Sequence, residues 1–191
     1  YTIFRDGDLY RMYYRGSHHQ EETKKAGHPE VTCYAESKDG VHWIKPNLGL
    51  FEFDGSKENN IVWDGIGTHN FVAFKDTNPD CPKEAKYKGM ARGRPRGKRG
   101  LYIYQSADAI NWNLMRDEPV ITKGKFDSQN LAFWDDHANI YREYHRTFVN
   151  GKRAIMTGTS KDYVTWTEPV LLKYPETPAE HLYTNAVLPY P

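Results

Sequence analysis

The sequence predicts an all-β protein with a β-propeller fold, of which this chain covers about three blades and the start of another. A phrase of the form S-x-D-x-x-x-W occurs three times, beginning at Ser37, Ser106 and Ser160. Short apolar runs alternate with turn residues along the chain, whereas helical periodicity is nearly absent. A phrase that recurs at such intervals indicates an array of equivalent structural units.

The repeating unit is larger than this phrase. Upstream of each copy lies a Tyr-basic-x-x-x-Arg pattern, which begins at three tyrosines: Tyr10, Tyr87 and Tyr141. Further upstream an asparagine opens an apolar run, at Asn70, Asn130 and Asn185. We therefore expect repeats at about 1–66, 67–126 and 127–181, and the start of the next at 182–191. Since both ends of the chain fall inside a repeat, we expect it to be a fragment of a longer protein.

The third copy is the shortest and indicates four strands. We expect the first three at 130–134, 140–146 and 153–159, and a fourth that ends near Leu172. Asn150-Gly151 is the preferred two-residue turn of a hairpin and separates the second strand from the third. A single blade cannot bury both faces, so large Trp and Tyr side chains are expected between neighbouring blades. A β-sandwich with coincidental repeats is the alternative fold.

Bulk composition restricts the class of partner. The formal net charge is +1, which gives no overall case for nucleic acid or an anionic membrane as partner. No apolar stretch is long enough for a transmembrane helix. Cys33 occupies an expected core strand, so we expect a free buried thiol there rather than a disulfide. Neither cysteine has metal-ligand spacing, and His18, His19 and His28 fit a solvated loop better than a metal site. We expect no cofactor and no metal.

Blade topology assigns the repeated motifs to two faces of the expected channel. The turns after the first and third strands, including the S-x-D phrases, lie on one face. We expect these phrases to be structural, because Ser and Asp side chains accept hydrogen bonds from nearby turn amides. The loops before the first strand and between the second and third strands lie on the other face. That loop-ringed mouth is the natural pocket of the fold.

Three groups of residues are expected at the channel mouth, of which the third is the pair of insertions that carry the three histidines above and the basic stretch 94–99. The first group enters the inner strands and comprises His69, Asn70, Asp127, Gln129, Asn130, Glu180, His181, Tyr183 and Asn185. The second group ends the second strands and comprises Arg15, Arg92 and Arg146. Three guanidinium groups converging there would favour an anionic ligand. Alternatively, the arginines form ion pairs between blades. The alternative for the asparagines is that their side chains simply hydrogen-bond to the backbone of an adjacent blade.

Asp127 departs from the repeat. The equivalent positions, three residues before the asparagines of the other copies, are Gly67 and Leu182. A function is often added at a position where one copy of a repeated fold differs from the rest. The alternative is that Asp127 caps the turn at Ser128. Glu180 lies in a proline-punctuated loop, where a solvated surface acid is the simpler interpretation.

Three segments carry a family resemblance: Phe4-Arg5-Asp6, the phrase from Ser37 to Trp43, and the stretch from Phe126 to Asp135. Together they resemble the five-bladed β-propeller glycoside hydrolases of the invertase, levanase and arabinanase types. More closely, the chain is similar to bacterial relatives described as glycosyl-hydrolase family 32 N-terminal-like. The resemblance covers essentially the whole chain at the level of the blade pattern, and it implies five blades.

The resemblance also implies a glycosidase that uses an acid/base pair of carboxylates across the channel mouth. On matching positions Asp127 is the first candidate and Glu180 the second. The chain departs from the family because it lacks the W-M-N-D-P-N-G and E-C-P phrases, and Gly7 stands where R-D-P would place proline. Either the partner acids lie outside this segment or the chemistry differs.

The sequence therefore leads to one preferred function and two alternatives. We expect a bacterial glycosidase, secreted or periplasmic, that acts on the end of a glycan with Asp127 in its site. Its partner would be a carbohydrate, with an anionic sugar left open, and neither nucleic acid nor a membrane. The first alternative is a propeller that binds sugar without catalysis. The second is a sialidase-like enzyme, which would require a tyrosine nucleophile paired with an acid.

Overall fold

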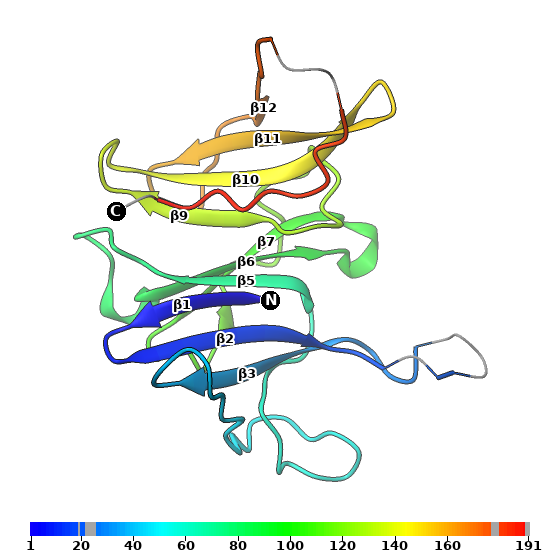
Figure 1. Ribbon diagram of the computed structural model, residues 1–191, viewed down its shortest axis with the longest axis vertical. Helices are drawn as coiled ribbons and strands as arrows, with labels where there is room; N and C mark the ends of the chain where they lie inside the picture. The colour runs from blue at the N-terminus through cyan, green and yellow to red at the C-terminus, as the bar shows by residue number, and fades with distance from the viewer. Residues whose placement is uncertain (19, 22–25, 177–179, 190–191) are drawn as a thin grey trace.

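The computed structural model describes residues 1–18, 20–21, 26–176 and 180–189 and contains three four-stranded antiparallel sheets (Figure 1). The first sheet consists of β1 (Thr2–Asp6), β2 (Leu9–Gly16), β3 (Val31–Ser37) and β4 (Ile61–Trp63). The second consists of β5 (His69–Lys75), β6 (Tyr87–Gly93), β7 (Gly100–Ser106) and β8 (Asn113–Leu114). The third consists of β9 (Leu131–Asp135), β10 (Ile140–Val149), β11 (Lys152–Ser160) and β12 (Val170–Leu171). The predicted all-β class is confirmed.

Each sheet is a meander in which consecutive strands pair, as the repeat predicted. In the third sheet the turn between β10 and β11 is Asn150-Gly151, with φ of 48° and 76°. Positive φ at both positions is what a tight hairpin turn requires, and asparagine and glycine tolerate it best. The two 3₁₀ turns, Lys83–Ala85 and Pro95–Gly97, are the helical elements of the described residues. None of the described helices is long and apolar enough to cross a membrane.

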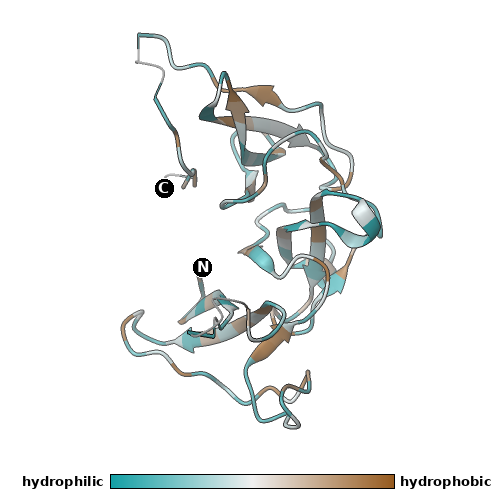
Figure 2. Ribbon diagram, turned by 90° about the vertical axis from the view of Figure 1, so that its right-hand side faces the viewer, coloured by the Kyte–Doolittle hydropathy of each residue, from teal (hydrophilic) through white to brown (hydrophobic). Residues whose placement is uncertain are grey.

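The three sheets follow one another around an arc, and both chain ends lie on its inner side (Figure 2). The first strands of the sheets are neighbours, since β5 contacts both β1 and β9. In the first sheet Tyr10 pairs with Ser37 at one end, whereas Gly16 pairs with Val31 at the other. His69 pairs with Arg92 at this second end of the second sheet. The S-x-D phrases therefore lie at the opposite end of the strands from Arg15, His69 and Arg92.

The S-x-D phrases form equivalent turns, as predicted. In the first copy Ser37 Oγ donates a 2.9 Å hydrogen bond to Asp39 Oδ1. The same oxygen accepts hydrogen bonds from the backbone amides of Val41 and His42. The same contacts recur from Ser106 and from Ser160. These phrases are structural elements of the turn that follows each third strand.

Tyrosine hydroxyls join neighbouring sheets at repeated positions. Tyr87, which opens β6, donates to Asp6 Oδ2 of the first sheet at 2.7 Å. Tyr141 of β10 donates to Asp76 Oδ2, beside the second sheet, also at 2.7 Å. Between sheets, Tyr13 of β2 donates to the carbonyl of Ala109 at 2.6 Å. The recurring tyrosine thus has a structural role, because it satisfies an acid of the preceding sheet while its ring fills the interface.

The C-terminal segment contributes an anchor without forming a strand. Residues 180–189 form no β-strand, although the amide of Leu182 donates to the carbonyl of Arg153 on β11 at 3.0 Å. Asn185 is nevertheless buried, and its amide lies 3.2 Å from the Gln129 carbonyl and 3.3 Å from the Tyr144 carbonyl. Cys33 is a free buried cysteine on β3, as expected, and Cys81 is also free.

Candidate functional site

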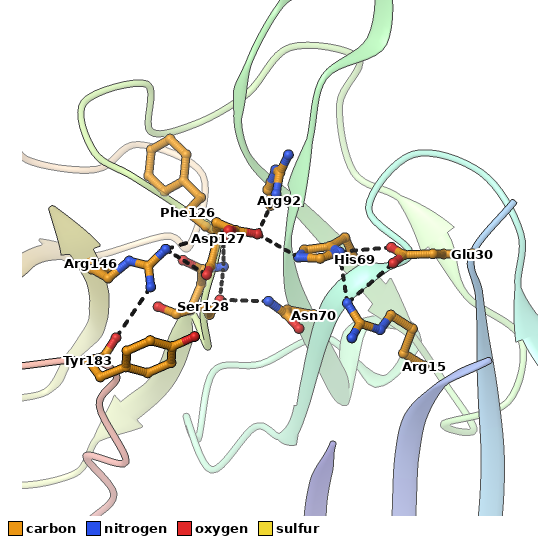
Figure 3. A network of polar contacts seen from close by, with 11 residues as sticks. Arg15, Glu30, His69, Asn70, Arg92, Phe126, Asp127, Ser128, Arg146 and Tyr183 are labelled. Carbon is orange, nitrogen blue, oxygen red and sulfur yellow. Dashed lines mark hydrogen bonds and ion pairs between the residues drawn. The ribbon is translucent and has the colours of Figure 1, made fainter. Parts of the chain in front are cut away.

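Asp127 lies in the segment that enters β9 and receives contacts from two sheets (Figure 3). Its Oδ1 accepts from Arg92 Nη1 at 2.8 Å and lies 3.0 Å from His69 Nε2. Arg146 Nη2 lies 3.8 Å from Oδ2 and donates to the backbone carbonyl of Asp127 at 2.7 Å. The side chain is 60% exposed despite these contacts. A carboxylate is therefore fixed in orientation while one side remains open.

His69 connects Asp127 to a second carboxylate. Its Nδ1 lies 2.8 Å from Oε2 of Glu30, which precedes β3, and Arg15 Nη1 lies 3.3 Å from Oε1 of the same residue. The imidazole thus has a carboxylate oxygen at each nitrogen. Arg15 comes from β2, His69 from β5 and Asp127 from the entry to β9, so three sheets contribute to one network (Figure 3).

Glu30 was not among the residues that the sequence singled out, although a signal for it exists. Counted back from the serine of each S-x-D phrase, Glu30 occupies the position of Arg99 and Arg153 in the other copies. It is thus a second acid that breaks the repeat, as Asp127 does. The insertion between the second and third strands of the first copy concealed it.

A hollow of about 380 Å³ lies beside Asp127. Its lining combines the chain's first residues, both inner-strand entries and the C-terminal segment: Tyr1, Thr2, Arg15, His69, Asn70, Phe71, Val72, Asp127, Ser128, Gln129, Tyr183 and Thr184. The lining is mostly polar, with hydrogen-bonding groups of both kinds. Such a hollow suits a ligand that carries many hydroxyl groups.

The recurring asparagines hydrogen-bond to backbone carbonyls. Asn70, with a φ of 57°, donates to the carbonyl of Ser128 at 3.1 Å and so joins the second sheet to the third. Asn130 is fully buried and donates to the carbonyls of Phe126 and Ser128. Asn130 and Asn185 therefore hold the inner-strand entries in place, which is the backbone-bonding alternative left open above.

The candidate site residues of the C-terminal segment, Glu180, His181 and Tyr183, do not lie in one hollow. Glu180 lies in another hollow, of about 630 Å³, whose lining includes Val149, Leu171 and Tyr174, and it does not line the hollow at Asp127. His181 Nδ1 lies 3.2 Å from the backbone nitrogen of Arg153. Tyr183 does reach the Asp127 hollow, with its ring 63% exposed.

The arginines of the network are all paired with acids or backbone. Arg92 bonds to Asp127, Arg15 to Glu30, and Arg146 is 6% exposed beneath the Asp127 carbonyl. Three guanidinium groups and two carboxylates meet here, so the cluster carries a surplus positive charge before His69 is counted. Arg92 forms an ion pair between the second and third sheets, whereas Arg15 pairs within the first sheet and lines the hollow.

His28 of the first insertion contacts aromatic and backbone groups. Its ring meets that of Phe53 edge to face with centroids 4.8 Å apart, and its Nδ1 lies 2.6 Å from the carbonyl of Pro29. His19 lies outside the described residues. Among those that are described, no group of three His, Cys, Asp or Glu side chains could hold a metal ion.

Comparison with known proteins gives relatives at the level of fold. No family model matches the sequence. The uncharacterized protein Rv1502 of Mycobacterium tuberculosis is 29% identical over 136 residues, which cover 69% of this chain and 39% of that protein. A fructofuranosidase from Schwanniomyces occidentalis, solved with fructose, superposes with a TM-score of 0.56 at 16% identity, over 89% of this chain and 32% of that one.

A second solved structure is a β-1,2-mannobiose phosphorylase from Listeria innocua, with a TM-score of 0.55 at 12% identity over 92% of this chain and 59% of that one. The chain has the β-propeller fold of these enzymes. It spans less than two thirds of the length of each of these three proteins. At 12–16% identity the superposition establishes only the fold of this chain. The two solved structures are of enzymes that act on carbohydrates.

Proposed function

We propose that this chain belongs to a carbohydrate-active propeller enzyme that cleaves glycosidic bonds, with Asp127 in its active site. The observation that carries the proposal is the position of Asp127. It is an acid that the other copies of the repeat lack, it is 60% exposed, and it lines a polar hollow at the ends of the inner strands. The carbohydrate-active enzymes among the solved neighbours support the same class of substrate.

The contacts of Asp127 favour one of the two carboxylate roles. Arg92 bonds to Oδ1 of Asp127 at 2.8 Å and Arg146 lies 3.8 Å from Oδ2, and a carboxylate held by two guanidinium groups suits a nucleophile or a base better than a proton donor. The proton donor would be a second acid. Glu30 is joined to Asp127 through the His69 ring, but Arg15 pairs with it as Arg92 pairs with Asp127, which disfavours Glu30 as the donor in the same way.

The group between Asp127 and Glu30 bears on the choice of the second acid. The His69 imidazole bridges the two carboxylates, whereas a glycosidase holds the glycosidic bond and water between its acids, and Glu30 does not line the hollow beside Asp127. Glu180, in its separate hollow, is the weaker candidate for the second acid.

The test is turnover of a glycan panel by the full-length protein, with and without inorganic phosphate, since the solved neighbours include a phosphorylase. Asp127→Asn preserves the shape of the side chain but removes its charge, and we expect it to lower kcat by about a hundredfold or more. Asp8→Asn, an exposed acid at the other end of the strands, is the matched control. If Asp127→Asn kept the full rate on a glycan that the parent cleaves, the assignment of Asp127 would be wrong.

The second candidate function is sugar binding without catalysis. Its specific support is that Oδ1 of Asp127 already bonds Arg92 and His69, while the exposed ring of Tyr183 could stack on a sugar. This candidate predicts a measurable heat of binding with the same panel and no product. The sialidase-like alternative loses one of its supports, since the S-x-D phrases form turns away from the hollow.

A further inference from the structure

Strand β10 holds the segment that presents Asp127 at three points. The carbonyl of Lys123 lies 2.9 Å from His145 Nε2, and the amide of Lys125 donates to the carbonyl of Arg146 at 2.7 Å. The carbonyl of Asp127 accepts from Arg146 Nη2 at 2.7 Å. Alternate residues of the 123–127 segment are thus bonded to two consecutive residues of β10, which fixes the path of the segment into the site.

The same segment packs tightly on the imidazole of His145. Phe126 is fully buried, and its ring centroid lies 5.2 Å from that of His145. Gly124 has a φ of +151°, and a Cβ there would come within 2.5 Å of His145 Cδ2. Because Phe126 points into the core, the next side chain, Asp127, points out toward the hollow.

His145 is in turn fixed by a buried acid. Both side chains, Glu143 and His145, are fully buried, and Nδ1 of His145 lies 2.7 Å from Oε2 of Glu143. Nε2 faces the carbonyl of Lys123, which can only accept, so Nε2 carries a hydrogen. The 2.7 Å contact requires a second hydrogen on one of its two atoms.

The pair therefore shares a proton and is neutral as a whole, which suits its burial. Its neighbours cannot supply or remove charge. The residues that pair with Glu143 and His145 on β9 and β11 have no titratable side chain: Ala132, Gly158 and Met156. On the loop side the pair meets the Lys123 carbonyl and the Phe126 ring, while the Lys123 ammonium bonds to Glu168.

We propose that Glu143 and His145 form a buried positioning pair that holds the 123–127 segment so that Asp127 points into the hollow. Neither residue lines that hollow, so they act through Lys123 and Phe126. The catalytic consequence rests on the proposed function of Asp127. The positioning itself is measurable without any substrate, so the two proposals can fail separately.

The substrate-free test is amide hydrogen exchange of the full-length protein, followed by mass spectrometry of peptides that cover 121–129. His145→Phe keeps a ring against Phe126 but removes both hydrogen bonds, and we expect exchange in this segment to rise about tenfold or more. His145→Gln retains a donor for the Lys123 carbonyl and should restore most of the protection. Tyr13→Phe, which loses a buried hydrogen bond between the first and second sheets, should leave 121–129 unchanged.

Two results would overturn the proposal: unchanged exchange at 121–129 in a folded His145→Phe protein, or equal loss of protection across all three sheets. Should His145→Phe fail to fold, Gly124→Ala leaves both residues of the pair in the sequence but places a Cβ against the His145 ring, and it must loosen the same segment. On a glycan that the parent cleaves, His145→Phe should lower kcat about tenfold to a hundredfold with little change in KM, because a misplaced carboxylate binds but does not react. A proportionate rise in KM with kcat unchanged would contradict positioning.

Discussion

His69 and Asp127 are 58 positions apart in the sequence, yet Nε2 of one lies 3.0 Å from Oδ1 of the other. His69 opens β5 of the second sheet, and Asp127 precedes β9 of the third. The other imidazole nitrogen meets Glu30 at the start of β3 in the first sheet. Each sheet thus supplies one member of the network, so the site depends on how the three sheets are packed together.

Glu30→Gln should lower kcat on a cleaved glycan by about tenfold, with a smaller effect on KM. The amide does not compensate the charge of Arg15, and it is a weaker acceptor than the carboxylate for the His69 Nδ1 contact. Glu52→Gln, at an exposed position outside the network, serves as the control and should keep the parent rate. Equal kinetics for the two variants would remove Glu30 from the site.

Tyr13→Phe should destabilise the protein by about 1–3 kcal/mol in denaturant unfolding, because the carbonyl of Ala109 is then buried without its donor. Tyr174→Phe, at a 46% exposed ring, should change the free energy of unfolding by less than about 0.5 kcal/mol. If both variants were equally stable, the contact between the first two sheets would not depend on this hydroxyl.

Asp108→Ala should lower stability at neutral pH, and the difference should disappear in acid. Burial alone would raise the pKa of Asp108, but hydrogen bonds from Asn111, Ile110 and Ser106 outweigh it and lower the pKa to about 2. A carboxylate whose pKa is lower in the folded than in the unfolded protein contributes stability at pH values above the unfolded pKa. That stability is lost as pH falls from about 4 to 2. Since this carboxylate is partly exposed, we expect about 1 kcal/mol after solvent screening. Unfolding curves at neutral and acid pH measure the difference.

Glu143→Gln should change the pH dependence in the opposite direction. Burial raises the pKa of Glu143, although the hydrogen bond with His145 opposes the rise. A raised pKa contributes stability that is fully present below the unfolded value and is lost as pH rises through the folded value. As pH rises through this raised pKa, the parent should therefore lose stability relative to the Glu143→Gln variant. A difference that stays constant from acid to alkaline pH would show that the pair does not lose its proton.

The strands and turns were predictable because their signals are local. Asn150-Gly151 specifies a hairpin turn by backbone conformation alone, and the Ser37-Asp39 turn is closed by side chains within five residues. The location of the arginines also followed from the repeat, since a fixed register places Arg15 and Arg92 at one end of their strands. Asp127 was singled out by the same comparison.

The remaining parts of the site depend on long-range packing. Glu30 follows an insertion that the other copies do not share, so its approach to His69 could not be read from the register of the strands. Glu180 shares a loop with Tyr183, but the path of that loop is set by contacts such as that of Leu182 with the carbonyl of Arg153. A buried pair such as Glu143 and His145 resembles an ordinary alternating strand in sequence, because only the sheet reveals which face is covered.

The most direct test is a crystal structure of the full-length Asp127→Asn protein with a glycan that the parent cleaves. We predict that the glycan occupies the hollow lined by His69, residue 127 and Tyr183, with a glycosidic oxygen or anomeric carbon next to residue 127. A glycan bound instead at the S-x-D end of the sheets, or in the hollow beside Glu180, would contradict the central role of Asp127.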